Sequence, residues 1–288
     1  MTTAPDRQLI EQRPEPESEQ PRPTLARVSG LGFRYPAAPR PVLDEVAFKV
    51  EAGRSIGIVG PSGCGKSTLL ALLAGLLRPT GGAIEWAPVS PGRHPISMVF
   101  QKDTLLPWRT VTDNVLLSSH LKEGRRARGR AGEKPKVEDL LALAGLTEAA
   151  SLYPHQLSGG MRRRVAFLSA VAPLPRTLLL DEPFSSVDEP TRVDIHQDVF
   201  DIAHKYDMTM ILVTHDLAEA LSLCDEVLIL STRPGTVVSS HPVPFGRQRK
   251  MLELRQTPEF LEMYGLLWRD LSQQIAIGKT RTGNGNAL

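Results

Sequence analysis

A glycine-rich segment at residues 60–68 carries the clearest chemical capability in the sequence. It reads GPSGCGKST, which contains the pattern G-x-x-x-x-G-K-[ST]. Backbone N–H groups of such a loop converge on phosphate oxygens, and the helix that follows adds the positive end of its dipole. Lys66 should then reach the β- and γ-phosphates of a nucleotide, while Ser67 ligates Mg²⁺. We expect nucleotide contacts throughout the segment, from Gly60, Pro61, Ser62, Gly63, Cys64, Gly65, Lys66, Ser67 and Thr68.

Plainer interpretations of this segment exist. A glycine turn could precede a helix whose lysine is merely solvated. The position of the segment, between a strand-like run and the helical run KSTLLALLAGLL, favours the phosphate loop. Cys64 lies inside the loop, and we interpret it as a small filler rather than as a nucleophile.

Two carboxylates, Asp181 and Glu182, follow the apolar run at 178–180. A carboxylate at the end of a buried strand, beside a phosphate loop, lies where Mg²⁺ needs a ligand, and we assign this role to Asp181. Because side chains alternate along a strand, Glu182 should point elsewhere and be free to polarise an attacking water. Without the phosphate loop upstream, the pair could simply cap the next helix.

Gln101 and His215 also end apolar runs, MVFQ and LVTH. Both should therefore emerge at the same edge of a parallel sheet as the carboxylates. We expect His215 to bond the γ-phosphate and orient water, although a lone histidine in such a place is usually structural. Gln101 offers a carbonyl oxygen to Mg²⁺ and an amide to water.

A second glycine loop, LSGGM at 157–161, precedes another helical stretch. Ser158, Gly159 and Gly160 would form a second anion-binding helix N-terminus. A nucleotide already held by the first loop suggests that the second loop serves the nucleotide of another molecule. Since each loop occurs once per chain, two chains would pair head to tail, each ATP lying between one phosphate loop and the partner's LSGG. The plainer alternative is an ordinary helix cap.

Short apolar runs alternate with helical stretches along much of the chain. The runs have strand length, and the helices between them are what parallel β-α-β units require. A helical region joins them at about 102–165. Its basic stretch at 122–136 has the composition of a solvated loop, with a partner-binding patch as the alternative. The predicted fold is an α/β core with a parallel sheet and a helical insertion. The strand-like runs lie at 54–60, 96–101, 176–183, 208–216 and 226–232.

Composition narrows the class of protein. The chain has 288 residues with 41% hydrophobic and 23% charged residues, as is ordinary for a soluble globular protein. A net charge of +2 argues against a dedicated nucleic-acid binder. Two cysteines cannot build a disulfide framework, so a reducing cytosol is expected, and we expect neither a signal peptide nor a membrane span. Residues 1–23 and 277–288 read as disordered tails.

The ordered set of motifs resembles the ATP-binding subunit of an ABC transporter over roughly residues 25–240. GPSGCGKST is similar to the Walker A loop, VFQ to the Q-loop, LSGGM to the signature, LLLDEP to Walker B, SSVD to the D-loop and VTHD to the switch-histidine segment. The resemblance implies a RecA-like P-loop NTPase core at 24–245, with an N-terminal antiparallel β subdomain and the inserted helical subdomain. It also implies ATP-driven dimerisation and docking to membrane subunits near the Q-loop. Tyr35 matches the position that stacks on adenine, although it could equally belong to the core.

Narrower features resemble the nitrate/sulfonate/taurine branch of bacterial importers. They include LLPWRTVTDNV at 105–115, HDLAEALSLCDEV at 215–227 and STRPGTVV at 231–238. This resemblance implies a peripheral subunit on the cytoplasmic face of the inner membrane, which binds transmembrane permeases and works with a solute-binding protein, without nucleic acid. The alternatives are a soluble ABC ATPase that is not coupled to transport and a non-hydrolysing regulatory subunit. The transported solute cannot be read from this chain.

Several positions depart from the family pattern. Ser169 stands where an arginine is usual, and Ser186 and Val187 stand where alanine and leucine are usual. The resemblance implies that turnover could be low for this reason. Arg162, Arg163 and Arg164 crowd the start of the helix that follows LSGGM; they form either a solvated face or a phosphate-directed field.

Residues 246–276 are expected to form a C-terminal helical extension. Thr257 is a suitable N-cap and Pro258 a suitable first helical residue. Apolar residues follow at helical spacing, and we expect this face to pack on the chain's own core, with a second chain as the alternative. These residues are Phe260, Leu261, Tyr264, Leu267, Trp268, Leu271 and Ile275.

Overall fold

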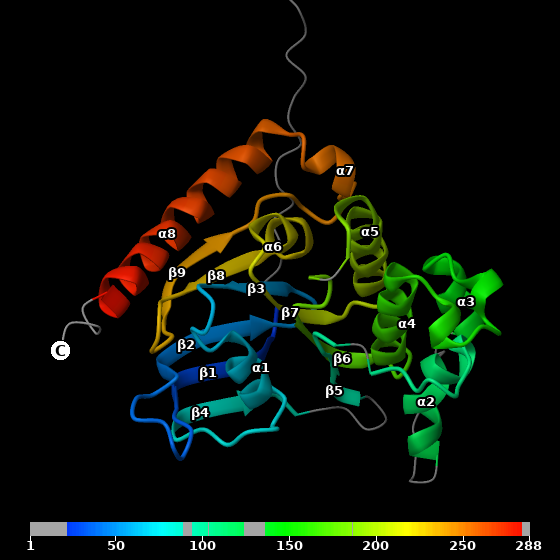
Figure 1. Ribbon diagram of the computed structural model, residues 1–288, viewed down its shortest axis with the longest axis horizontal. Coiled ribbons are helices and arrows are strands. Elements are labelled where there is room, and N and C mark those ends of the chain that lie inside the picture. The colour runs from blue at the N-terminus through cyan, green and yellow to red at the C-terminus, as the bar shows by residue number, and fades with distance from the viewer. Residues whose placement is uncertain (1–21, 89–93, 103, 124–135, 186, 284–288) are drawn as a thin grey trace, which may run out of the picture.

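The structure, a computed structural model, describes residues 22–88, 94–102, 104–123, 136–185 and 187–283 (Figure 1). Several features predicted from the sequence therefore lie outside the described residues. They are most of the N-terminal tail, nearly all of the basic stretch at 122–136, Ser186, and residues 284–288.

A six-stranded sheet forms the centre of the molecule, in the order β5-β6-β7-β3-β8-β9. The first five strands are parallel, and β9 pairs antiparallel with β8. All residues of β3 and β7 are buried, as expected for strands that are covered on both faces. The strands are β3 (Ser55–Val59), β5 (His94–Val99), β6 (Pro175–Asp181), β7 (Thr209–Thr214), β8 (Glu226–Leu230) and β9 (Val237–Pro242).

A smaller antiparallel sheet comes from the N-terminal part of the chain, in the order β2-β1-β4. It consists of β1 (Thr24–Phe33), β2 (Leu43–Glu51) and β4 (Gly81–Trp86). Apolar residues of β1 and β2 join α1 (Lys66–Leu73) and one face of the large sheet in a common core. Together with the parallel sheet, this confirms the predicted P-loop NTPase fold with an N-terminal antiparallel subdomain.

The inserted helices lie together at one side of the molecule, on the right in Figure 1. They are α2 (Val111–Glu123), α3 (Val137–Leu143) and α4 (Gly159–Val171), joined by short 3₁₀ turns at Thr147–Ala149 and Pro154–Gln156. Their core is continuous with α5 (Glu189–Lys205) and with Leu178 and Leu180 of β6. Helix α4 thus runs past residue 165, because its second half packs on the sheet rather than within the insertion.

Helices α6 (Leu217–Leu223) and α8 (Pro258–Gly283) cover the other face of the large sheet, and α7 (Met251–Leu254) precedes α8 (Figure 1). Thr257 caps α8, since its Oγ1 accepts a hydrogen bond of 3.3 Å from the amide of Phe260. Phe260, Leu267 and Leu271 are buried against α6 and β8, so the extension packs on its own core. Three further residues of the predicted stripe, Leu261, Tyr264 and Trp268, are exposed.

Helix α8 continues to Gly283, beyond residue 276, where the sequence predicted the extension to end. A Cβ atom at Gly278 would lie 3.2 Å from the hydroxyl of Thr232, so the helix approaches the turn after β8 closely at this point. The helix is thus formed in a segment whose composition alone favours disorder. None of the helices in the described part of the chain combines the length and the apolar character needed to cross a bilayer.

Candidate functional site

The residues singled out from the sequence meet at the carboxyl edge of the parallel sheet. Strands β5, β6, β7 and β3 are consecutive neighbours, so the segments that leave their carboxyl ends lie next to one another. These segments carry Gln101 after β5, Asp181 and Glu182 at the end of β6, His215 after β7 and the glycine loop after β3. The sheet order therefore explains why positions more than a hundred residues apart share one site.

The glycine loop connects β3 to α1 with the N-terminus of the helix uncapped by any side chain. Gly65 has φ 110°, in the left-handed region, and a Cβ atom there would lie 2.7 Å from Leu43 Cδ2, so only glycine fits. The side chain of Lys66 is buried and curls over the loop. Its Nζ donates to the carbonyls of Gly60 at 2.8 Å and Pro61 at 3.2 Å. This geometry holds a cation beside an open helix N-terminus, which is an anion-binding arrangement.

Ser67 and Asp181 form the hydroxyl–carboxylate pair expected of a Mg²⁺ site. The hydroxyl of Ser67 donates to Asp181 Oδ1 at 2.9 Å. Burial raises the pKa of Asp181, and the hydrogen bond from Ser67 opposes that effect, as does the nearby Lys66. A divalent cation would favour the charged carboxylate that burial disfavours.

The donor set suits Mg²⁺ brought in with a nucleotide. Among the described residues, no three His, Cys, Asp or Glu side chains are grouped to hold a metal ion on their own. Mg²⁺ in such sites takes only one or two protein oxygens and completes its shell with phosphates and water. Ser67 and Asp181 fit that pattern. Gln101 directs its Nε2 at Glu182, and the use of its carbonyl oxygen as a Mg²⁺ ligand stays a prediction.

Glu182 lies at the centre of the remaining polar groups. Its Oε2 accepts from Gln101 Nε2 at 3.4 Å and lies 3.2 Å from Nδ1 of His215. Glu182 follows the last residue of β6 and has φ 44°, while its amide donates to the carbonyl of Val213 at 2.8 Å. Its side chain thus diverges from that of Asp181, as predicted, but the cause is this left-handed turn rather than the pleat of a strand. The turn directs a carboxylate toward a glutamine and a histidine.

A cavity of about 370 Å³ lies in front of the glycine loop. Tyr35 stands at its side, and its hydroxyl is 3.3 Å from Thr68 Oγ1. The ring of Tyr35 packs edge-on against Phe33, with centroids 4.8 Å apart, yet the residue remains 42% exposed. It belongs to the cavity wall and not to the core, so a planar base can reach it. The lining residues are Tyr35, Val42, Ser62, Gly63, Gly65, Lys66, Ser67, Thr68, Glu182 and Arg233.

Arg233 is a cavity residue that the sequence reasoning missed. It lies in the turn between β8 and β9, which is tied to the start of β2. The amide of Gly235 donates to the carbonyl of Val42 at 2.8 Å, and the amide of Asp44 donates back to Gly235 at 3.0 Å. The sequence feature that could have pointed to Arg233 is the segment STRPG. The family resemblance used this segment only as a marker of the importer branch.

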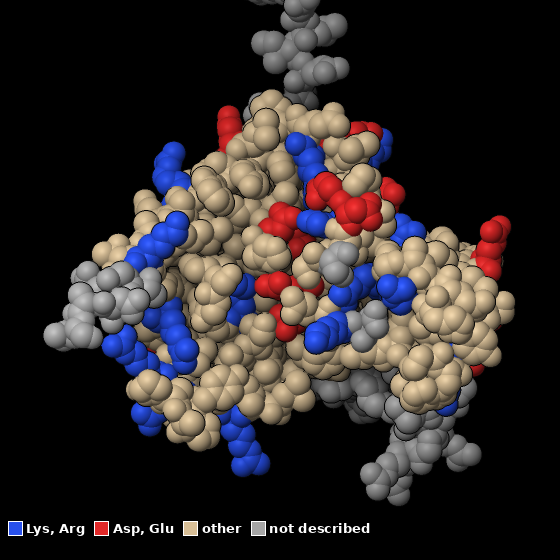
Figure 2. All heavy atoms as spheres, viewed as in Figure 1, with Lys and Arg blue, Asp and Glu red and all other residues tan. Residues whose placement is uncertain are grey.

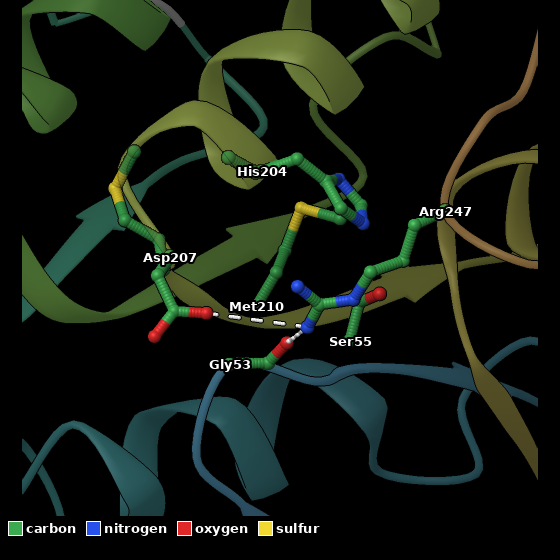
Figure 3. Close-up of a pocket in the computed structure, with 8 residues that line it drawn as sticks. Gly53, Ser55, His204, Asp207, Met210 and Arg247 are labelled. Atoms are coloured by element: carbon green, nitrogen blue, oxygen red, sulfur yellow. Dashed lines mark hydrogen bonds and ion pairs between the residues drawn. The ribbon is translucent and has the colours of Figure 1, made fainter. Parts of the chain in front are cut away.

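A second cavity, at the opposite edge of the sheet, is not a nucleotide site (Figure 3). It lies beside the start of β3, at Ser55, and its volume of about 10 Å³ has room for no more than one water molecule. Arg247 closes it by donating to the carbonyl of Gly53 at 2.9 Å and by approaching Asp207 (Figure 3). The arginine therefore acts as a structural tie at that edge.

The second glycine loop lies at the start of α4, away from the cavity in front of the first glycine loop. Ser158 is the N-cap, and its Oγ accepts from the amide of Met161 at 3.2 Å, so the plain capping role exists. Ser158 and Gly159 are exposed, and a Cβ atom on Gly159 would meet nothing within 4 Å. In the part of the chain that the structure describes, neither these two residues nor Gly160 lines the cavity at the first loop. The anion-binding role of the loop stays a prediction that requires a second molecule.

The three arginines after this loop bond other groups of the chain, so they are not merely a solvated face, and a phosphate-directed field stays a prediction. Arg162 donates to the carbonyl of Leu157 at 2.7 Å. Arg163 is buried and donates to the carbonyls of Phe100 and Gln101. It joins the signature helix directly to the segment that carries Gln101. Nothing in the sequence pattern predicted these backbone partners.

Arg164 pairs with Asp198 of α5 at 3.0 Å. Burial nevertheless raises the pKa of Asp198 to about 6, so desolvation outweighs the attraction of Arg164. Ser169, at the position where an arginine is usual, donates to the carbonyl of Val165 at 2.8 Å, within its own helix.

Comparison with known proteins agrees with this geometry. Residues 43–185 match the family described as ABC transporter. The nitrate import ATP-binding protein NrtC of Synechococcus elongatus is 39% identical over 235 residues, which cover 81% of this chain and 35% of that protein. The aliphatic sulfonates import ATP-binding protein SsuB 1 of Xanthomonas axonopodis pv. citri is 38% identical over 228 residues, covering 77% of this chain and 89% of that protein. The chain thus spans about a third of NrtC and most of SsuB 1.

A solved structure shows the same fold. The ATP-binding cassette MJ0796, described as a dimeric post-hydrolysis state bound to ADP and Pi, superimposes with a TM-score of 0.64 at 26% identity. The match covers 77% of this chain and 100% of that chain. The whole length of that cassette therefore has a counterpart in this chain.

The buried carboxyl group of Asp198 predicts a pH dependence of stability. The pKa of Asp198 is about 6 in the folded chain and 3.8 ordinarily. The contribution of this carboxyl group to the free energy of unfolding is therefore complete at low pH and is lost as the pH rises through about 6. Between pH 5 and pH 8, the free energy of unfolding measured with urea should fall by about 1 kcal/mol more for the wild type than for Asp198→Asn. Glu85→Gln, a change at an exposed glutamate of β4 that does not contribute to the raised pKa of Asp198, should keep the wild-type dependence. Equal pH dependence of wild type and Asp198→Asn would contradict the assignment.

Proposed function

The chain belongs to the ABC transporter family of ATP-binding proteins, and on that premise we propose that it hydrolyses MgATP in a pair of copies to drive the import of a small anion. The observation that carries the proposal is the meeting of Lys66, Ser67, Asp181 and Glu182 at one sheet edge beside a cavity lined by Tyr35. Such a site has an anion cradle, oxygen ligands for Mg²⁺, a carboxylate base and an aromatic wall.

Each residue has a distinct part in hydrolysis. Lys66 and the N-terminus of α1 hold the β- and γ-phosphates, while Tyr35 stacks on the base. When bound, Mg²⁺ neutralises negative charge on the phosphate oxygens. Glu182 polarises the attacking water, because it lines the cavity that would hold the nucleotide. Gln101 and His215, both within 3.4 Å of that oxygen, orient the carboxylate and the water.

A second copy of the chain completes each site. Ser158, Gly159 and Gly160 lie on the helical insertion, outside the cavity at the first loop. The exposed position of Ser158 and Gly159 suits a nucleotide bound to another molecule. One copy of each loop per chain then gives a head-to-tail pair with two ATP molecules at its interface. Closure around ATP and release after hydrolysis supply the mechanical stroke. The relative MJ0796 is likewise described as a dimer.

The partner in the membrane is a permease, and the chain lies at the cytoplasmic face of the inner membrane as a peripheral subunit. The relatives named above import nitrate and aliphatic sulfonates, and we infer a solute of this class, taurine included, delivered by a solute-binding protein. Phe100 and Trp108 flank the Gln101 segment and are 42% and 70% exposed. Aromatic side chains exposed beside the catalytic site offer a docking surface that couples the permease to hydrolysis.

Replacing Glu182 with glutamine tests hydrolysis. Glu182→Gln keeps the size and hydrogen-bonding capacity of the side chain but removes the base, so turnover should fall by at least about a hundredfold. ATP binding should persist, and gel filtration with MgATP should show a trapped dimer. Glu85→Gln, a change at an exposed glutamate of β4, should behave like the wild type. Hydrolysis by Glu182→Gln at the wild-type rate would remove the base assignment.

Purification from gently solubilised native membranes tests the coupling to transport. A multi-span membrane protein should copurify in stoichiometric amount, and its solute-binding protein can then be screened with nitrate, sulfonates and taurine. Trp108→Glu should lose the membrane partner while keeping ATPase activity, because the side chain is far more exposed than buried. Reproducible recovery of soluble complexes or ribosomes alone, with ATPase activity intact, would favour a soluble ABC ATPase.

A further inference from the structure

A chain of buried polar side chains runs from the C-terminal segment to the loop that carries His215. It begins at Arg255, the C-cap residue of α7. Helix α7 lies beside α5 (Figure 1). The guanidinium group pairs with Glu189 of α5, donates to Ser222 Oγ of α6 at 3.2 Å and donates to Nδ1 of His196 at 3.1 Å. One side chain thus joins the C-terminal segment to two helices of the core.

His196 forms the next link. It is fully buried, and its ring packs edge-on against Phe184, with centroids 5.2 Å apart. Guanidinium groups only donate hydrogen bonds, so Nδ1 must accept and the ring proton lies on Nε2. That nitrogen lies 3.5 Å from Oε1 of Glu219, a close polar contact rather than a hydrogen bond, because neither atom has a hydrogen-bond partner among the described residues. Arg255 therefore sets both the tautomer and the orientation of the ring.

Glu219 and Thr214 complete the connection to the histidine loop. Both are buried, and the hydroxyl of Thr214 donates to Oε2 of Glu219. The same hydroxyl accepts from the amide of Asp216 at 3.0 Å. Thr214 and Asp216 are the two neighbours of His215, so this pair of bonds fixes the backbone on both sides of it. The direction in which His215 leaves the sheet depends on these bonds.

A second branch from Arg255 reaches the segment after Glu182. Glu189 pairs with Arg192 at 3.3 Å, and Arg192 pairs with Asp216 at 3.1 Å. Arg192 also donates to the carbonyl of Val187 at 2.7 Å, within the D-loop. In Figure 2 acidic and basic side chains lie side by side over this region of α5, α6 and α7. Both branches end at loops that border the hydrolysis site.

From these contacts we infer that Arg255 is a positioning residue for hydrolysis, acting through His196, Glu219 and Thr214 on His215. The inference rests on the proposed ATPase function and gives the C-terminal segment a share in setting the geometry of that site. Loss of Arg255 leaves His196 buried with an unpaired acceptor, and such groups rearrange to recover partners. The turn around His215 then loosens, and the 3.2 Å contact of its Nδ1 with Glu182 is lost.

Steady-state kinetics of Arg255→Met tests the inference. The kcat for ATP should fall at least about tenfold, because small displacements of orienting groups have effects of this size or larger. The KM for MgATP should stay within about twofold of wild type, since Arg255 does not line the nucleotide cavity. Arg247→Met is the matched control: this arginine lies in the same C-terminal region and holds only Gly53 and Asp207 among the described residues, so kcat should not change.

Variants of His196 distinguish a loss of positioning at the site from general destabilisation of the fold. His196→Gln keeps an acceptor for Arg255 and a donor for Glu219, so it should restore most of the activity that His196→Leu loses. The double variant Arg255→Met/His196→Leu should lose no more activity than either single variant, because both break the same chain. Additive losses, an unchanged kcat in Arg255→Met, or a rise in KM as the main effect would each overturn the inference. Absence of ATPase activity in the wild type would instead contradict the proposed function.

Discussion

The parallel pairing of β6, β7 and β3 is the constraint on which the site depends. These strands are almost wholly buried, and their register places the end of β6 level with the ends of β7 and β3. The hydrogen bond of 2.9 Å between Ser67 and Asp181 exists only because β7 separates their strands by a fixed distance. Glu182 turns toward His215 because its own amide bonds the carbonyl of Val213 on β7. Pairing of the sheet backbone thus aligns the groups of the site, which contacts between the side chains alone could not align.

The two glycine loops are held by different parts of the structure, which suits the proposed pairing of two copies of the chain. The first loop is fixed to the central sheet, and its lysine is buried in it. The second begins a helix of the insertion, where Arg163 ties it to the Gln101 segment and Arg164 ties it to α5. A movement of the insertion therefore changes the second loop and Gln101 together. Under the proposed function, this linkage would let a membrane partner bound near Gln101 sense the nucleotide state.

Much of this arrangement could be predicted from the sequence, because motif residues at strand ends follow a general rule of parallel sheets. The strands, the helical insertion and the meeting of Lys66, Asp181, Glu182, Gln101 and His215 were accessible in this way. The partners of Arg163 and Arg255 were not, since carbonyls and buried histidines leave no spacing pattern. Glu182 was placed correctly for the wrong reason, because a left-handed residue after a strand cannot be inferred from its side chain. The far end of α8 was missed because its composition favours disorder, and the close approach of Gly278 to Thr232 leaves no pattern in the sequence.

The most direct test of the account mixes two inactive variants. Lys66→Ala disables the first loop, and Gly159→Glu puts a carboxylate into open space at the second without disturbing the fold. Each variant alone should be inactive. An equal mixture should regain up to about a quarter of the wild-type rate, since half of randomly formed pairs are mixed and each mixed pair holds one intact site. Mixed pairs that form, as shown by differently tagged chains, but remain inactive would contradict the shared site.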